Sequence, residues 1–216
     1  MKKKYLEDIE LISEKLKSLP RIWDGKTAIL EMKEENFNWK QMEWWGFYFE
    51  LLVKKSLNNN FQFPGDKFDK VKFDMKRSIN WDLKSHGIKT LSHSIILNDE
   101  EAVRKSIELN KYHGLLIAIC DIEYNDKDRS FQKWHTELKG GKSLYEQKRE
   151  ERTTFSRYRK TKAELLELVM IVLNQKNLSK LDVFQQGRNA NGKPRRPKLM
   201  LNLEVSDKFE FYNLKY

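Results

Sequence analysis

Residues 73–87 read Phe-Asp-Met-Lys-Arg-Ser-Ile-Asn-Trp-Asp-Leu-Lys-Ser-His-Gly, a stretch in which a polar turn separates two strand-like segments. Asp82 and Lys84 are two positions apart, so on a β-strand their side chains leave the same face. Asp74 lies on the neighbouring strand if residues 76–80 form a hairpin turn. The stretch therefore predicts two carboxylates and one ammonium group that converge at the edge of a sheet.

This combination of side chains suits a divalent cation. Mg²⁺ prefers hard oxygen ligands and binds through a few carboxylates together with several waters. A lysine beside such an ion can orient or deprotonate a water, as metal-assisted phosphodiester hydrolysis requires. An Asp-x-Lys triplet also arises by chance in a chain with 42 lysines and arginines. The alternative interpretation is a solvated strand edge. The order of the elements around the triplet helps to choose between this and a metal site.

The segments around this stretch alternate between helical and extended patterns. Helices are predicted at residues 5–19, 38–57 and 100–110, the last with Asp99 as its N-cap. Strands are predicted at residues 61–63, 70–75, 79–85, 94–97 and 115–120. Residues 21–35 are interpreted as a short mixed segment. A strand-helix-strand unit beside a hairpin predicts an α/β fold, with a mixed central β-sheet flanked by helices.

The helix predicted at residues 38–57 carries acids on an otherwise apolar surface. Glu43 and Glu50 are seven positions apart and share one stripe, on which Gly46 lies between them. A glycine inside a helix costs roughly 1 kcal/mol, so its presence indicates the close approach of another backbone. Either the stripe is exposed to solvent, or one glutamate contributes to a metal site.

The order helix, β-meander, helix, strand over about residues 38–120 resembles the catalytic core of the PD-(D/E)xK nuclease superfamily. Asp74 fits the first acid of that pattern, and Asp82 and Lys84 fit its acid-x-lysine. Phe73 stands where a proline often precedes the first acid. The resemblance implies a restriction-endonuclease-like core. The run 81–86, followed later by Asn98-Asp99, resembles type II restriction endonucleases in particular.

Two positions of the pattern stay open. The superfamily often supplies a further acid from the preceding helix, which here is Glu50 or, less readily, Glu43. The first acid is Asp74, with Asp66 and Asp69 as competitors.

The resemblance also implies a cofactor and a role for each residue. One or two Mg²⁺ ions per active site would be held by Asp74, Asp82, Glu50 and the backbone carbonyl of Leu83. Lys84 would position or activate the attacking water.

The chain is basic, with a formal net charge of +10, which suggests a polyanionic partner such as nucleic acid. A lysine-rich genome composition is the alternative explanation for part of this charge. Residues 139–162 hold nine basic side chains against three acidic ones, among them Arg157, Arg159 and Lys160. Such a segment suits phosphate contacts, and an exposed charged helix face is the alternative.

A second basic segment, residues 185–198, contains glycines and prolines that predict a loop. Its candidate DNA-binding residues are Gln186, Arg188, Asn189, Lys193, Arg195, Arg196 and Lys198. Amide side chains can bind adenine edges and arginine can bind guanine in the major groove, whereas lysines neutralise phosphates. A disordered basic loop is the alternative.

The remaining segments are predicted from their apolar pattern. Residues 163–173 are interpreted as an apolar helix in the core or a dimer interface, and residues 199–205 and 208–214 as a closing hairpin. Cys120 is expected to be a buried core residue. Gly141-Lys142-Ser143 lacks the earlier glycine of a phosphate-binding loop, so no nucleotide cofactor is expected. The four histidines show no metal-binding spacing.

Together these features predict a single domain over residues 1–216, with DNA-recognition elements at about 139–203. The expected protein is a sequence-specific, Mg²⁺-dependent type II restriction endonuclease of double-stranded DNA, a homodimer that matches a palindromic site. No membrane span or signal segment is expected, so the protein would be cytoplasmic and prokaryotic. The alternatives are a repair or recombination nuclease of the same superfamily and a DNA-binding protein without catalysis.

Overall fold

The computed structural model describes residues 3–64, 73–89, 93–142, 144–151, 158–189, 191–204 and 209–216. Its helices are α1 (Tyr5–Leu16), α2 (Gly25–Glu34), α3 (Trp44–Leu57), α4 (Glu100–Asn110), α5 (Ser130–Leu138), α6 (Leu144–Glu151) and the 3-10 turn η1 (Leu178–Lys180). Its strands are β1 (Ile22–Asp24), β2 (Met75–Lys76), β3 (Asn80–Gly87), β4 (Ser94–Asp99), β5 (Tyr112–Glu123), β6 (Lys162–Asn174), β7 (Asp182–Phe184), β8 (Lys198–Asn202) and β9 (Glu210–Lys215).

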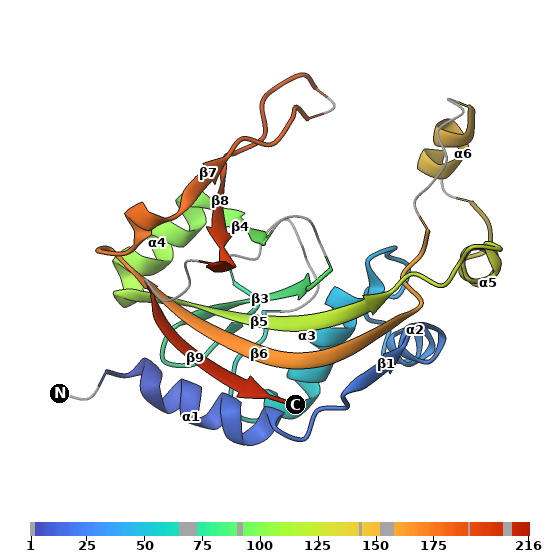
Figure 1. Ribbon diagram of the computed structural model, residues 1–216. Coiled ribbons are helices and arrows are strands. Elements are labelled where there is room, and N and C mark those ends of the chain that lie inside the picture. The colour runs from blue at the N-terminus through green and yellow to red at the C-terminus, as the bar shows by residue number, and fades with distance from the viewer. Residues whose placement is uncertain are drawn as a thin grey trace.

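The protein is a mixed α/β structure built on a curled central sheet (Figure 1). The strand order is β1-β6-β5-β3-β2, and β9 also pairs with β6. Strands β3 and β5 run parallel, from Asn80 opposite His113 to Gly87 opposite Cys120, and the other pairs of this sheet are antiparallel. Helix α4 connects β4 to the start of β5. The mixed sheet and its flanking helices confirm the predicted fold at this level.

Two apolar clusters cover the two faces of this sheet. Helices α1, α2 and α3 pack on one face, where Trp44, Phe49 and Trp81 are buried. Helix α4 and a small sheet of order β4-β8-β7 pack on the other face, around Ile107 and Leu115. Side chains of β3 and β5 therefore alternate between two closed apolar layers, which explains why the predicted strand at 115–120 is apolar on both sides.

Helix α4 begins where the sequence predicts. The Asp99 carboxylate accepts a hydrogen bond of 2.9 Å from the amide of Ala102, which satisfies one of the free N–H groups of the first turn. The helix ends at Lys111, whose φ of 67° lies in the left-handed region. The chain then enters β5 at Tyr112.

The predicted helix at residues 163–173 is wrong, because this segment forms β6. Opposite β5, the register shifts so that Ile119 pairs with Glu167 and Cys120 with Leu165, which leaves Leu166 as an extra residue. Such a β-bulge reverses which face the following side chains occupy. The apolar residues before and after it consequently recur at spacings of three and four, which imitates a helix.

The predicted hairpin of residues 199–205 and 208–214 is also wrong. Strand β8 pairs with β4 and β7 in the small sheet, whereas β9 pairs with β6 in the central sheet. The alternating pattern correctly indicates strands, but it contains no information about distant partners.

Several boundaries also differ from the predicted ones. Residues 21–35 form β1 and α2, with the Asp24 carboxylate accepting from the amide of Thr27 at 2.9 Å. The helix predicted from residue 38 begins at Trp44. The predicted strand at 61–63 is reduced to a single bridge between Gln62 and Lys76, and the strand predicted at 70–75 lies partly outside the described residues.

A buried acid of α1 accepts hydrogen bonds from the β2–β3 turn. Asp8 is fully buried, and its carboxylate accepts hydrogen bonds from Arg77 Nη1 at 2.9 Å, the Ser78 amide at 3.1 Å and Trp81 Nε1 at 3.0 Å. A buried carboxylate is tolerated only when its oxygens are satisfied in this way. Asp8 thereby fixes the turn that joins β2, which begins directly after Asp74, to β3, which carries Asp82.

None of the helices within the described ranges has the length and apolar character needed to cross a membrane.

Candidate active site

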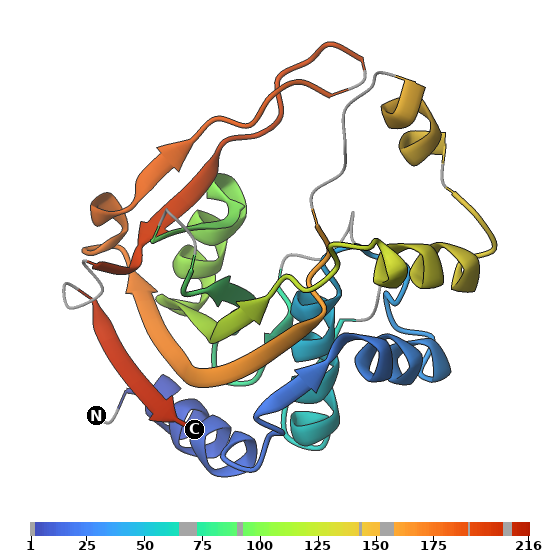
Figure 2. The ribbon, with the colours of Figure 1, turned by 45° about the vertical axis from the view of Figure 1, so that its right-hand side comes forward.

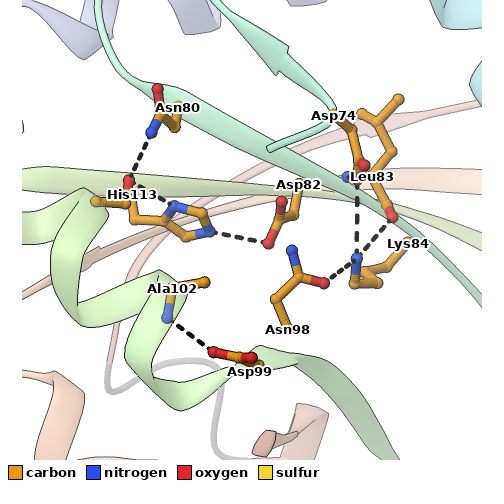
Figure 3. Close-up of polar contacts among 10 residues, drawn as sticks. Asp74, Asn80, Asp82, Leu83, Lys84, Asn98, Asp99, Ala102 and His113 are labelled. Carbon is orange, nitrogen blue, oxygen red and sulfur yellow. Dashed lines mark hydrogen bonds and ion pairs between the residues drawn. The ribbon is translucent and has the colours of Figure 1, made fainter. Parts of the chain in front are cut away.

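The β2–β3 hairpin brings Asp74 next to the Asp-x-Lys triplet, as the sequence predicts. The Asp74 amide donates to the Trp81 carbonyl at 3.0 Å, and the Asp74 carboxylate accepts from the Leu83 amide at 2.6 Å. Lys84 Nζ lies 3.8 Å from Asp74 Oδ2 (Figure 3). Two carboxylates and one ammonium group thus share one edge of the central sheet.

Asp82 points from β3 toward the first residues of β5. Its side chain is 0% exposed, and Oδ2 lies 3.1 Å from His113 Nε2. The other oxygen, Oδ1, is buried without a hydrogen-bond partner among the described residues. A buried acceptor left in this state costs free energy, so its presence in a polar cluster indicates a place for an ion or a water.

Lys84 links the acids to the small sheet. Its side chain is 19% exposed, and Nζ donates to the Leu83 carbonyl at 3.1 Å and to Asn98 Oδ1, on β4, at 3.3 Å. These contacts hold the ammonium group between β3 and β4.

The charges of the three groups act on one another. Burial raises the pKa of Asp74, and the neighbouring negative charge of Asp82 adds to this rise against the opposing effect of Lys84. For Asp82, burial also favours the neutral form, but the charge of Lys84 and the contact with His113 outweigh it and hold the pKa below its usual range. Of the two carboxylates, Asp82 therefore stays ionised and Asp74 accepts a proton first.

Burial alone would lower the pKa of Lys84, but the negative charges of Asp82, Asp74 and Glu50 raise it above its usual value. Lys84 is therefore an ammonium ion that neutralises the acids around it.

The two candidate acids of α3 differ in their surroundings. Glu50 is half-buried and acts electrostatically on Lys84. Glu43 is exposed, pairs with Lys160 and accepts a hydrogen bond from Trp45 Nε1. Between them, a Cβ atom at Gly46 would lie 3.0 Å from Ser85 Oγ, so α3 approaches β3 closely there. Glu50 thus lies on the side of Lys84, and its role toward a metal stays a prediction.

The oxygen atoms of this site fit a hard cation. They are the bare Oδ1 of Asp82, the carboxylate of Asp74 and the carbonyl of Leu83. Within the described part of the chain, no group of three or more histidine, cysteine, aspartate or glutamate side chains is placed to hold a metal ion. Mg²⁺ often uses only one or two carboxylates and completes its shell with waters and substrate phosphates. The donor set is compatible with that mode of binding.

The two described candidates of the first basic segment pair with acids of the protein. Arg159 is buried, with Nη2 3.2 Å from a Glu146 carboxylate oxygen of α6. Lys160 pairs with Glu43 and lies over the Trp45 ring, with Nζ 5.1 Å from its centroid. Their predicted contact with DNA stays a prediction, as does that of Arg157, which lies outside the described residues together with Asp66 and Asp69.

The second basic segment forms an arm between β7 and β8, of which residues 185–189 and 191–197 are described. The arm folds back on itself, with a bridge between Arg188 and Pro194 and a hydrogen bond of 2.8 Å from the Asn189 amide to the Lys193 carbonyl. Figures 1 and 2 show that it extends away from the central sheet on the side opposite α1. The predicted loop is therefore a folded projection.

The candidate side chains are distributed along the length of the arm. Arg188, Asn189, Lys193 and Arg195 are exposed, and Gln186 is half-buried. At the base, Arg196 pairs with Asp99 at 3.5 Å and with Glu101 at 3.3 Å.

Lys198 lies just beyond the arm, at the start of β8. It is half-buried opposite Asp99 in the β4–β8 ladder, and its charge contributes to the low pKa of Asp82. The arm is thus attached directly beside the candidate active site.

The sequence analysis missed several residues of the site. In the sequence, His113 was only one of four histidines without metal-binding spacing, and Asn98 entered only through the resemblance to restriction endonucleases. Asn80 was only the end of the predicted turn, and Ser106 carried no signal. Their positions depend on the parallel register of β3 and β5 and on the packing of α4 and β4, which local patterns do not contain.

Comparison of the chain with models of protein families, with curated proteins and with solved structures found no match in any of the three.

Proposed function

We propose that this protein is a Mg²⁺-dependent endonuclease that hydrolyses phosphodiester bonds of double-stranded DNA, with a restriction-endonuclease-like core. The observation that supports this proposal best is the convergence of Asp82 and Lys84 on β3 with Asp74, directly before β2. Lys84 Nζ lies 3.8 Å from Asp74 Oδ2, and Asp82 Oδ1 is buried without a hydrogen-bond partner among the described residues. A solvated strand edge, the alternative interpretation, would not bury Asp82 completely.

The residues divide the chemistry among them. A bound Mg²⁺ would offset negative charge on the phosphodiester and make a water more acidic. Asp74, Asp82 and the Leu83 carbonyl would hold the ion, and Glu50 would extend this set on the side of Lys84. The Lys84 ammonium, fixed by Leu83 and Asn98, would orient the attacking water and stabilise charge that develops on the phosphate.

The arm supplies contacts with the bases and the backbone in this proposal. Arg188, Asn189 and Gln186 would bind base edges, while Lys193 and Lys198 would neutralise phosphates. The net charge of +10 agrees with a polyanionic partner. Because a palindromic site presents two scissile strands, we propose that the protein cuts as a homodimer of the type II restriction class.

A digest of mixed plasmids with Mg²⁺ tests the proposal. We expect discrete bands from the wild-type protein and none from Asp82→Ala, while the matched variant Glu14→Ala, which removes an exposed carboxylate of α1, should cut normally. A smear would indicate a nuclease without sequence preference, such as a repair enzyme. Absence of cutting together with tight DNA binding would favour a DNA-binding protein without catalysis.

A further inference from the structure

A chain of buried polar side chains ends at Asp82. Asn80 Nδ2 donates to Ser106 Oγ at 3.0 Å, Ser106 Oγ lies 3.0 Å from His113 Nδ1, and His113 Nε2 lies 3.1 Å from Asp82 Oδ2 (Figure 3). The four residues come from β3, α4 and β5, and each is at most 7% exposed. Side chains far apart in the sequence are thus joined in one line inside the second apolar cluster.

The direction of each hydrogen bond follows from the donor at the far end. Ser106 Oγ already accepts from the Asn80 amide, so the serine hydroxyl can donate its proton to His113 Nδ1. A neutral imidazole that accepts at Nδ1 carries its proton on Nε2, which then donates to the ionised Asp82. With the bonds in this direction, every link donates toward Asp82, and His113 carries its proton on Nε2.

Burying these polar side chains in an apolar layer costs free energy, because they lose their contacts with water. Their presence therefore suggests a function beyond packing. Leu115 and Ile117 alternate with the residues between them on the same face of β5 as position 113, so an apolar residue at position 113 would continue this apolar face without that cost. What the imidazole adds is a fixed orientation of one carboxylate: Oδ2 is occupied, and Oδ1 is left as the bare atom.

We propose that His113, held by Ser106, is a positioning residue that orients Asp82 so that Oδ1 is available to a divalent cation. This inference rests on the proposed function, because it assigns the support of the metal-holding carboxylate. Groups that orient a metal ligand typically change metal affinity by roughly 10- to 100-fold when removed.

The test measures Mn²⁺ affinity by electron paramagnetic resonance in the absence of DNA, alongside the Mg²⁺ dependence of cleavage and the thermal midpoint. We expect His113→Leu to weaken Mn²⁺ binding by roughly 10- to 100-fold. Cleavage by this variant should recover at high Mg²⁺. In the matched variant His113→Gln, the amide can replace the Nε2–H donor, so Mn²⁺ affinity should stay close to that of the wild type. Ser106→Ala should give a smaller loss than His113→Leu.

The wild-type protein offers a further measurement if His113→Leu does not fold. Nitrogen-15 chemical shifts of the His113 ring should report a proton on Nε2. An Nε2 atom without a proton, or unchanged Mn²⁺ affinity in folded His113→Leu, would overturn the inference. A wild-type protein that binds Mn²⁺ but cuts no DNA would refute the proposed function alone, since the affinities of the variants still decide the role of His113. A wild-type protein that binds no Mn²⁺ would refute both.

Discussion

The β3–β5 strand pair and the arm of residues 185–197 differ in how their polar groups are satisfied. Around β3, Asp82 and His113 are buried, and each contact depends on the register of two parallel strands. Along the arm, Arg188, Lys193 and Arg195 are exposed, and the backbone of the arm pairs mainly with itself. One region is built from distant parts of the chain and the other from a single local segment.

This difference predicts how each region responds to damage. A buried polar network loses much of its function when one member is removed, because the remaining members are left unsatisfied. Exposed cations contribute separately, and their effects add when they lie far apart. Single substitutions in the strand pair should therefore cause large losses of activity or stability. Single substitutions in the arm should each reduce DNA binding by a small amount.

The largest expected effect is the loss of cleavage in Asp82→Ala. Removing a metal-holding carboxylate should slow DNA cleavage on the order of a thousandfold, since the ion supplies several kcal/mol of charge stabilisation. Binding of uncut DNA in the presence of Ca²⁺ should persist. Lys84→Ala should also stop cleavage, whereas Lys15→Ala, at an exposed site of α1, should not. Wild-type cleavage rates in either site variant would place the chemistry elsewhere.

Asp8→Ala should be the most destabilising of these substitutions, because it leaves the donors of the β2–β3 turn without an acceptor. We expect a loss of about 3 kcal/mol in the free energy of unfolding, measured with urea. The neighbouring Glu7→Ala removes an exposed carboxylate that lies 3.6 Å from the same Arg77 guanidinium, and it should cost less than about 1 kcal/mol. Equal losses in the two variants would show that burial of Asp8 does not hold the turn.

Substitutions in the arm should have smaller effects on DNA binding, and these should differ between base-contacting and phosphate-contacting residues. Arg188→Ala should cost roughly 1–3 kcal/mol of binding to the cognate site and relax preference at a single base position. Lys193→Ala should weaken binding to all sequences alike and reduce the salt slope by about one unit. The measurement compares the cognate site and a one-base variant at two salt concentrations, with Ca²⁺ replacing Mg²⁺. If neither variant changes affinity or preference, recognition lies outside the arm.

The smallest expected effect is a pH dependence of stability that comes from Asp74, beside β3. The pKa of Asp74 is raised by burial, so the folded state takes up a proton above the usual carboxyl range, and stability without metal should decline as pH rises through that window. Asp74→Asn should remove this decline, which urea unfolding at several pH values would detect. DNA binding without metal depends on the exposed arm in this proposal, so it should not follow the change at Asp74. A matching pH dependence in Asp74→Asn would assign the effect to another group.

The sequence was sufficient wherever a short pattern determines a local structure. The hairpin around residues 76–80 and the Asp99 cap could both be predicted, since each depends on neighbouring residues. At Gly46 a close neighbour was predicted correctly, but it is the Ser85 hydroxyl and not a backbone atom. Asp74 and Lys84 are brought together for the same reason, because a hairpin determines the register of its two strands.

The remainder depends on pairing between distant segments. The bulge at Leu166 gives β6 the apolar spacing of a helix, which led to the wrong prediction. The pairing of β9 with β6 could not be predicted from an alternating pattern. His113 entered the site only because its strand runs parallel to β3, with Asn80 directly opposite. The candidate acids and the lysine could thus be recognised in the sequence, whereas the residues that contact them from β4, α4 and β5 could not.

The ammonium group of Lys84 stabilises the candidate site in the protein without a metal ion. Asp74 and Asp82 would repel each other across the hairpin, but Lys84 supplies a permanent internal counter-charge, anchored to Leu83 and Asn98. We therefore expect the hairpin to fold without Mg²⁺. A chelator would stop the proposed chemistry and leave the protein folded, so the loss of activity should reverse as soon as the ion is returned.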